Sequence, residues 1–190
     1  MSHRVISGSA KGRKLKLVPG DSTRPIMDRV KEALFSILGH DVVGATFFDC
    51  FAGTGAVGIE ALSRGANFAL FTDMDRLAIK TIQENLAITQ LTEQGSVRRA
   101  DVLKILSGAP QPYDFLYIAP PQYKGLWLKA LQVLDDNPGW VGGEIIVQID
   151  PMEYEAAEFK HLELTDQRQY GKTMLLFMQI KSATQDNNDE

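Results

Sequence analysis

Cysteine and histidine are scarce in this chain. Among its 190 residues there are one cysteine and three histidines. The single thiol, Cys50, excludes a disulfide within the chain and a metal site built from cysteines. Three scattered histidines give metal catalysis little support, because a metal centre needs several ligands of this kind close together. We therefore expect no metal ion in the function.

Long apolar runs are also absent. No run approaches the roughly 20 apolar residues that a membrane-spanning helix requires, and no signal peptide opens the chain. Hydrophobic residues make up 44% of the sequence and charged residues 23%, proportions that are typical of a globular protein rather than of a disordered one. These values predict one folded, cytoplasmic protein without a membrane partner.

The net charge of −4 conceals an uneven distribution. Residues 1–32 carry eight basic and three acidic side chains, a net charge of +5, whereas the rest of the chain carries twelve basic and twenty-one acidic side chains, a net charge of −9. A basic arm on an acidic body is the pattern of a protein that meets phosphates at one end. The alternative is a solvated surface hairpin whose lysines only aid solubility.

The first 40 residues read as a hairpin followed by a helix. Residues 5–18 predict two short strands joined by a turn through Gly8–Gly12. A helix is expected from about Pro25, and its apolar residues at helical spacing are Val30, Ala33, Leu34, Ile37 and Leu38. We expect three cations to lie off this apolar stripe, free for solvent or a ligand: Arg24, Arg29 and Lys31.

From residue 41 onward, strand and helix patterns alternate, which indicates a parallel sheet. The expected strands cover residues 46–49, 68–72, 97–100, 113–118 and 144–149, and a closing antiparallel pair covers 163–168 and 173–180. We predict an α/β, Rossmann-like, doubly wound and mostly parallel sheet with a C-terminal antiparallel hairpin, preceded by the N-terminal hairpin and helix. Residues 41–181 form the predicted cofactor-binding domain, and residues 182–190 form a polar, disordered tail.

The strongest chemical signal lies at the end of the first of these strands, in the segment Asp49–Gly58. Its spacing, Gly53-x-Gly55-x-x-Gly58, lets the backbone turn tightly and a ligand approach without a Cβ in the way. The following helix N-terminus offers amide donors to a carboxylate or a phosphate.

Two ligands fit such a glycine loop. The spacing matches the dinucleotide fingerprint, with Asp73 about 20 residues on, so an NAD-dependent oxidoreductase is one alternative. However, Asp49 precedes the first glycine by four positions, where it would repel a pyrophosphate but hold the ammonium group of a methionine. The chain also ends in an apparent antiparallel hairpin, and we expect no substrate domain with a dehydrogenase histidine after it. We therefore favour S-adenosylmethionine (SAM) as the cofactor.

Further residues complete the predicted cofactor pocket. Asp73, nearest the second strand, is expected to accept both ribose hydroxyls of the adenosine, and Asp101 to bind the adenine amino group. Asp75 and Asp101 could instead cap the helices that follow them, and both roles can coexist. We also assign the following residues to this pocket: Phe51, Gly53, Gly55 and Ala119.

Seven blocks of the sequence match the pattern of one known family: residues 4–8, 12–15, 23–25, 28–35, 49–58, 60–66 and 73–76. Through these blocks nearly the whole chain resembles the RsmD family, bacterial methyltransferases that modify the exocyclic N2 amine of a guanine in 16S ribosomal RNA. The N-terminal arm and the segment Thr23-Arg24-Pro25 separate this family from methyltransferases in general.

The resemblance implies that the basic arm faces RNA, in 16S ribosomal RNA or the small ribosomal subunit, and that the protein is a monomer. Phosphate contacts of this kind supply affinity and register but little choice of sequence. The residues assigned to RNA are Arg4, Lys11, Arg13, Lys14, Arg24 and Arg29.

The chain departs from the family's catalytic signature, which is an acid or amide, two prolines and an aromatic residue after the fourth strand. Here the segment is Ala119-Pro120-Pro121-Gln122-Tyr123, and the last four residues are our catalytic candidates. A guanine amine is a weak nucleophile, and a side-chain oxygen with a proline carbonyl can accept its two hydrogens while the aromatic ring stacks on the flipped base. Ala119 has no side-chain acceptor.

Three outcomes follow from Ala119. Another group, such as Gln122, supplies the acceptor and leaves a slower enzyme; the target has changed; or the protein binds SAM and RNA without transferring a methyl group. General acid–base effects contribute about 10²–10⁴-fold, and proximity to the sulfonium supplies much of the rest. We therefore favour residual or altered methyl transfer.

Overall fold

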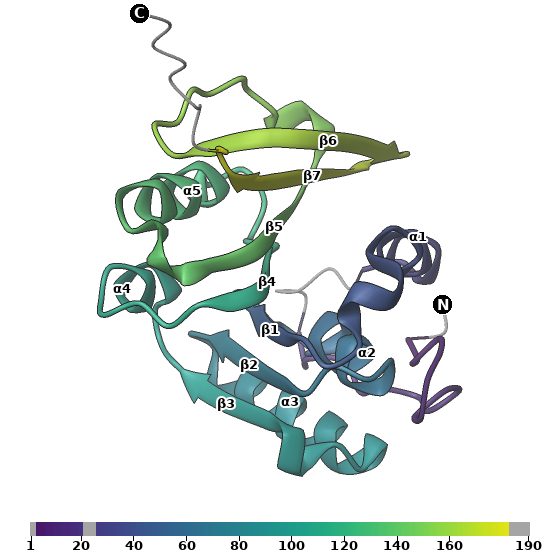
Figure 1. Cartoon of the computed structure of the whole chain (residues 1–190). Helices are drawn as coiled ribbons and strands as arrows, with labels where there is room; N and C mark the ends of the chain where they lie inside the picture. Colours follow the sequence, from purple (N-terminus) through teal and green to yellow (C-terminus); the bar gives the residue numbers. More distant parts are fainter. Residues whose placement is uncertain (1–2, 21–25, 183–190) are drawn as a thin grey trace, which may run out of the picture.

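The computed structural model describes residues 3–20 and 26–182 (Figure 1). Arg24 and Pro25, together with the tail from residue 183, lie outside the described residues, so the predictions made for them stay predictions. Within the described part of the chain, no helix is both long and apolar enough to cross a membrane.

A seven-stranded sheet in the order β3-β2-β1-β4-β5-β7-β6 forms the centre of the molecule. Its first five strands are parallel, and β7 lies antiparallel between β5 and β6. This arrangement confirms the predicted mostly parallel sheet with a closing antiparallel hairpin. The strands are β1 (Thr46–Asp49), β2 (Phe68–Asp73), β3 (Gly95–Arg99), β4 (Tyr113–Ile118), β5 (Val141–Ile149), β6 (Leu162–Tyr170) and β7 (Thr173–Ile180).

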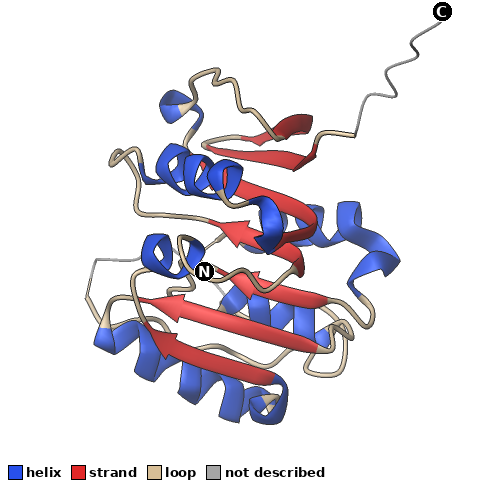
Figure 2. Cartoon of the chain, turned by 60° about the vertical axis from the view of Figure 1, so that its left-hand side comes forward, coloured by secondary structure: helices blue, strands red, loops and turns tan. Residues whose placement is uncertain are grey.

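Helices cover both faces of this sheet (Figures 1 and 2). One face packs against α1, α2 and α3, and the other against α4 and α5. The α-helices are α1 (Asp28–Leu38), α2 (Ala56–Ser63), α3 (Arg76–Thr89), α4 (Val102–Leu106) and α5 (Leu126–Asp136). Short 3₁₀ turns cover Gly39–Val42, Thr92–Gln94, Pro138–Trp140 and Pro151–Glu153.

The central strands are buried on both faces, which explains their continuous apolar runs. Successive side chains of a strand point to opposite faces. Phe47 accordingly packs into the core on the α2 face, whereas Phe48 packs into the core on the α5 face. Phe115 and Leu116 of β4 divide in the same way. One sheet therefore supports two hydrophobic cores.

The N-terminal arm, residues 3–18, differs from the predicted hairpin of two strands. Among its described residues, the only strand-type pairing is an isolated bridge between Arg4 and Lys14. The reason is that side chains of the helices satisfy the arm's backbone donors. Glu60 accepts from the backbone N–H groups of Ile6 and Ser7, and Ser63 accepts from that of Ala10. Together with three backbone hydrogen bonds between the two halves of the arm, these bonds satisfy its donors without a continuous strand ladder.

The expectation for Lys31 is wrong. Its side chain is 1% exposed instead of lying free for solvent or a ligand. Its Nζ donates to the carbonyl of Arg4 at 2.6 Å and lies 3.2 Å from a carboxylate oxygen of Glu60. Burial lowers the pKa of Lys31, and the neighbouring Glu60 opposes that shift. By contrast, Arg29 is exposed, as predicted.

Candidate cofactor site and catalytic loop

The predicted cofactor residues come together at one edge of the sheet. Asp49 ends β1, Asp73 ends β2, and Ala119 follows the last residue of β4. Parallel strands end at the same edge, and the order of strands reverses between β1 and β4. Ligands of doubly wound folds bind in the crevice outside the carboxyl ends of the strands, at this switch point.

The glycine loop owes its shape to left-handed backbone angles at two positions. Gly53 has a φ of 54° and Gly55 a φ of 77°, values that glycine adopts at no steric cost. A Cβ on Gly58, in the first turn of α2, would lie 2.3 Å from the ring of Phe71. This glycine therefore lets α2 pack closely on β2, and the helix N-terminus with its amide donors follows directly from the loop.

Asp49 is a buried carboxylate with one oxygen unused by the protein. Its side chain is 1% exposed, and Oδ2 accepts from the backbone N–H of Gly58 at 3.1 Å. Among the residues that the structure describes, Oδ1 has no hydrogen-bond partner. Burial, reinforced by the nearby charge of Asp73, raises the pKa of Asp49 to about 7. A bound cation would compensate this charge, which no described residue pairs.

Asp73 lies at the carboxyl end of β2 and also supports the glycine loop. Its Oδ2 accepts from the backbone N–H of Gly53 at 3.0 Å, and its Oδ1 accepts from that of Asp75 at 2.9 Å. Each carboxylate oxygen can accept more than one hydrogen bond, so this half-buried side chain keeps capacity for hydroxyl groups. Asp73 thereby links the shape of the glycine loop to the end of β2.

The two other acidic candidates are helix caps. Asp75 accepts from the backbone N–H of Leu77 at the start of α3, and Asp101 accepts from that of Leu103 at the start of α4. Both interactions are the N-cap contacts considered as the alternative in the sequence. Phe51 is half-buried beside the core of the α5 face.

The loop after β4, residues 119–125, is tied to the turn that follows β5. Ala119 and Pro120 are half-buried, whereas residues 121–125 are exposed. The hydroxyl of Tyr123 donates to Asp150 at 2.9 Å, and its backbone N–H donates to Glu153 at 2.5 Å. Tyr123 has a φ of 59°, which is unusual for a residue with a side chain. Two carboxylates therefore hold the loop in a strained conformation.

The basic side chains assigned to RNA lie on the surface. Those of the arm are exposed, and Arg4 also lies 3.4 Å from Asp28 of α1. Arg24 lies outside the described residues. The exposed members are Arg4, Lys11, Arg13, Lys14 and Arg29. The arm that carries most of them is fixed to the body, so its cations are presented by a docked segment.

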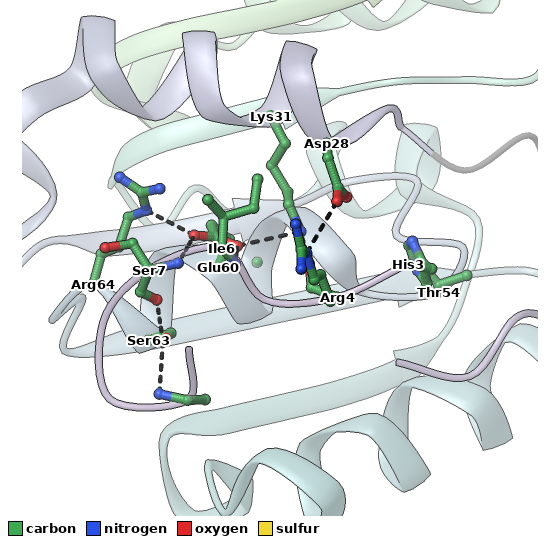
Figure 3. Close-up of polar contacts among 12 residues, drawn as sticks. His3, Arg4, Ile6, Ser7, Asp28, Lys31, Thr54, Glu60, Ser63 and Arg64 are labelled. Atoms are coloured by element: carbon green, nitrogen blue, oxygen red, sulfur yellow. Dashed lines mark hydrogen bonds and ion pairs between the residues drawn. The ribbon is translucent and has the colours of Figure 1, made fainter. Parts of the chain in front are cut away.

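Glu60, which the sequence reasoning missed, holds that arm in place (Figure 3). This residue is fully buried in α2, and its carboxylate receives the backbone N–H groups of two arm residues. It also lies 3.2 Å from Nζ of Lys31 and 2.8 Å from Nε of Arg64. A signal was present, because Glu60 is the one charged residue in a largely apolar helix segment, Ala56–Ser63. Such a residue predicts a buried partner.

Comparisons with known proteins agree with this geometry. A family described as "Conserved hypothetical protein 95" matches residues 3–179. The chain is 42% identical over 176 residues to YlbH of Bacillus subtilis, provisionally named as an rRNA methyltransferase, and the match covers 90% of this chain and 95% of that protein. It is 36% identical to ribosomal RNA small subunit methyltransferase D of Escherichia coli, over 77% of this chain and 73% of that one.

A solved structure shows the same likeness in three dimensions. The Escherichia coli protein yhhF, also provisionally named as a methyltransferase, superimposes with a TM-score of 0.84 at 32% identity. The superposition covers 95% of this chain and 99% of the other. The arm, the sheet and the closing hairpin are therefore features of a shared fold.

Proposed function

The chain belongs to the RsmD family of ribosomal RNA methyltransferases, and we propose that it transfers a methyl group from SAM to the exocyclic N2 amine of a guanine in 16S ribosomal RNA. The observation that carries the proposal is Asp49, whose buried Oδ1 has no partner among the described residues. A cation is the ligand that such an oxygen fits, and SAM brings an ammonium group.

The chain's own residues account for the three parts of SAM. Asp49 would bind the ammonium group, and the glycine loop with the N-terminus of α2 would approach the carboxylate. Asp73 would accept the ribose hydroxyls with the capacity that its two backbone contacts leave. Asp101 would meet the adenine while it caps α4. When bound, SAM supplies an electrophilic methyl group on a sulfonium.

The RNA is assigned to the arm and the loop after β4. The exposed arm cations would contact phosphates, which supply affinity and position the substrate. The loop would receive the flipped guanine, and the carbonyl of Pro120 would accept one hydrogen of its amine. We assign the protein to the cytoplasmic pool of ribosomal RNA, where it acts as a monomer.

Ala119 leaves the second hydrogen of the amine without the usual side-chain acceptor. Its effect on the rate is bounded, because one general acid–base interaction is worth about 10²–10⁴-fold. A chain that holds the two substrates together keeps the contribution of proximity. We therefore propose slow methyl transfer; an altered target and loss of catalysis are the alternatives.

The strand order argues against the oxidoreductase alternative. Dinucleotide-binding sheets have the order 3-2-1-4-5-6, whereas this sheet places an antiparallel β7 between β5 and β6. Asp49, which precedes the glycines, would also repel a pyrophosphate, because no cationic partner among the described residues neutralises its carboxylate.

Transfer from radiolabelled SAM to unmethylated small ribosomal subunits tests the proposal, with the wild type beside Ala119→Asp. We expect N2-methylguanine from both, located by mass spectrometry, and faster from the variant. Product from the variant alone would mean a scaffold that has lost its acceptor. No product from either, despite SAM binding, would overturn the ribosomal substrate.

A further inference from the structure

Gln148 lies beside Ala119, on the neighbouring strand of the sheet. The strands β4 and β5 are adjacent (Figure 1), and their register pairs Ile118 with Val147. One residue further along each strand, the same parallel register brings Gln148 next to Ala119. Both residues are half-buried. The position that lacks a side-chain acceptor therefore has a carboxamide as its neighbour.

The side chain of Gln148 lies on the same face of the sheet as that of Ala119. The hydroxyl of Tyr117 donates to Oε1 of Gln148 at 2.6 Å, so these two side chains share a face. Ala119 is two residues beyond Tyr117, and side chains two residues apart along a strand point the same way. In agreement, Tyr117 belongs to the hydrophobic core on the α2 face, and Ala119 packs against that core. Gln148 therefore adjoins the space that a longer side chain at position 119 would occupy.

Tyr117 holds the carboxamide oxygen of Gln148 in a defined place. The Tyr117 side chain is 3% exposed, and burial, reinforced by the charge of Asp49, raises the pKa of its hydroxyl well above the ordinary value. The hydroxyl therefore keeps its proton and remains a donor. A carboxamide oxygen has two lone pairs, and among the described residues only Tyr117 donates to Oε1. Gln148 is thus a positioned acceptor with capacity for a second hydrogen bond.

The strand order places Gln148 on the substrate side of the proposed cofactor site. That site assigns the ribose to Asp73 at the end of β2 and the ammonium group to Asp49 at the end of β1. The order β2-β1-β4-β5 then leaves β4 and β5 for the nucleophile. Gln148, next to last in β5, adjoins Ala119, the first residue of the loop after β4. An amine held by that loop therefore has a side-chain acceptor beside it in the sheet.

We propose that Gln148 is a catalytic residue that accepts the second hydrogen of the guanine amine, in place of a side chain at position 119. The inference rests on the proposed function, because it takes a guanine amine as the nucleophile. The nitrogen bonds to the methyl carbon while the carbon–sulfur bond breaks and its electron pair stays on sulfur; the surplus proton on nitrogen then passes to water. Positive charge develops on the nitrogen during this step, and a positioned acceptor stabilises it.

Gln122 is the other carboxamide available to the amine. It is exposed in the loop after β4, so holding it against a substrate costs side-chain entropy. Gln148 is already held by a buried hydroxyl before the substrate arrives, and acceptors fixed in advance contribute most to a reaction. The geometry therefore favours Gln148 over Gln122.

Single-turnover methyl transfer to unmethylated small ribosomal subunits, at saturating SAM, measures the contribution of Gln148. Gln148→Leu removes the acceptor and keeps the size, so the rate should fall about 100-fold. Equilibrium dialysis of S-adenosylhomocysteine should show unchanged binding. Gln148→Glu keeps an oxygen at this position and should retain the rate. Gln132→Leu, on the exposed face of α5, is the matched control and should behave as the wild type.

Two double variants separate an acceptor from a structural role. Ala119→Asn with Gln148→Leu returns a carboxamide to the same space from the other strand, so it should recover most of the lost rate. Tyr117→Phe with Gln148→Leu also removes the hydroxyl that Gln148→Leu leaves stranded, and it replaces the single variant in the comparison if that one loses cofactor binding.

A wild-type rate in Gln148→Leu would overturn the inference. So would a loss that Gln148→Glu shares, or one that Ala119→Asn does not recover. If the wild type methylates the subunit at the same rate as Gln148→Leu, only the inference fails. If the wild type binds S-adenosylhomocysteine but methylates no guanine, the proposed function fails and the inference fails with it.

Discussion

Asp49 and Glu60 are both buried carboxylates, eleven residues apart, and they differ in what the protein provides for them. Glu60 has four donors: two backbone N–H groups of the arm, Lys31 and Arg64. Among the residues that the structure describes, Asp49 has one donor, the backbone N–H of Gly58. The fold therefore completes one carboxylate and leaves the other incomplete.

The difference separates a structural charge from a ligand-binding charge. A buried charge whose partners are supplied by the chain holds segments together, and removing it leaves those partners stranded. A buried charge without partners raises the free energy of the ligand-free protein and is compensated by binding. The arm seat around Glu60 and the cofactor edge around Asp49 are examples of the two cases.

The largest effect we expect is from Glu60→Gln. The change leaves the ammonium group of Lys31 in the core without its counter-charge, so the free energy of unfolding should fall by about 3–5 kcal/mol. Urea denaturation measures this. The control, Glu84→Gln, changes a surface carboxylate that pairs with Lys16 and should leave the transition nearly unmoved. Equal effects in the two variants would contradict the role given to Glu60.

Replacing the carboxylate of Asp49 by a carboxamide should raise the free energy of unfolding instead of lowering it. Asp49→Asn removes an uncompensated buried charge, so the ligand-free protein should gain about 1 kcal/mol at pH 8. Binding of SAM should weaken by about 10- to 100-fold, since a charge-assisted bond is lost. Calorimetry and urea denaturation test the two halves. A destabilised variant with unchanged SAM affinity would show that Asp49 is a structural charge as well.

The pKa of Asp49 predicts how SAM binding depends on pH. The carboxyl is protonated below its raised pKa of about 7, and the ammonium group of SAM binds the ionised form. Affinity should therefore fall up to about tenfold per pH unit as the pH drops below 7. The same raised pKa favours the folded state at low pH, and that contribution is lost as the pH rises through 7. Calorimetry from pH 5.5 to 8.5 measures the first effect, and Asp49→Asn should show a nearly flat profile.

The smallest effect we expect is on RNA binding by the arm. Lys14→Ala removes one exposed cation and should weaken binding to the small subunit by a few-fold while lowering the dependence on salt by about one counterion. Filter binding at several salt concentrations measures both. Lys129→Ala, an exposed cation on α5, is the control. An equal loss of affinity in the control would mean that the cations of the arm contribute no more to RNA binding than other exposed cations do.

Local patterns were sufficient to predict the cofactor edge. Alternation of strand and helix gives the order of elements, and the limits of β1, β4 and β7 agree with those expected. Asp49 and the glycines lie within ten residues, so their arrangement follows from one turn. The start of β5 was missed: Gly142 and Gly143 are poor strand formers, and they lie at an irregularity of the β4–β5 pairing, where a Cβ would come within 3 Å of a carbonyl oxygen of β4.

The arm could not be predicted in the same way. Its backbone bonds go to side chains more than fifty residues away, such as Glu60 and Asn85, and no spacing rule connects such positions. An alternating pattern in residues 14–18 indicated a strand, yet the carboxamide of Asn85 forms hydrogen bonds with both the backbone N–H and the backbone carbonyl of Lys16. Lys31 was misplaced for the same reason, because its partner belongs to a different helix.

The central claim is that the protein methylates 16S ribosomal RNA and needs Asp49 to do so. The most direct test uses cells from which the gene for this protein has been deleted. Their 16S ribosomal RNA is analysed by mass spectrometry after the cells receive the wild type, Asp49→Asn or no copy. We predict that one N2-methylguanine is missing without the gene, returns with the wild type and does not return with Asp49→Asn, although that variant is folded. An unchanged set of methylated guanines in all three cultures would contradict the account.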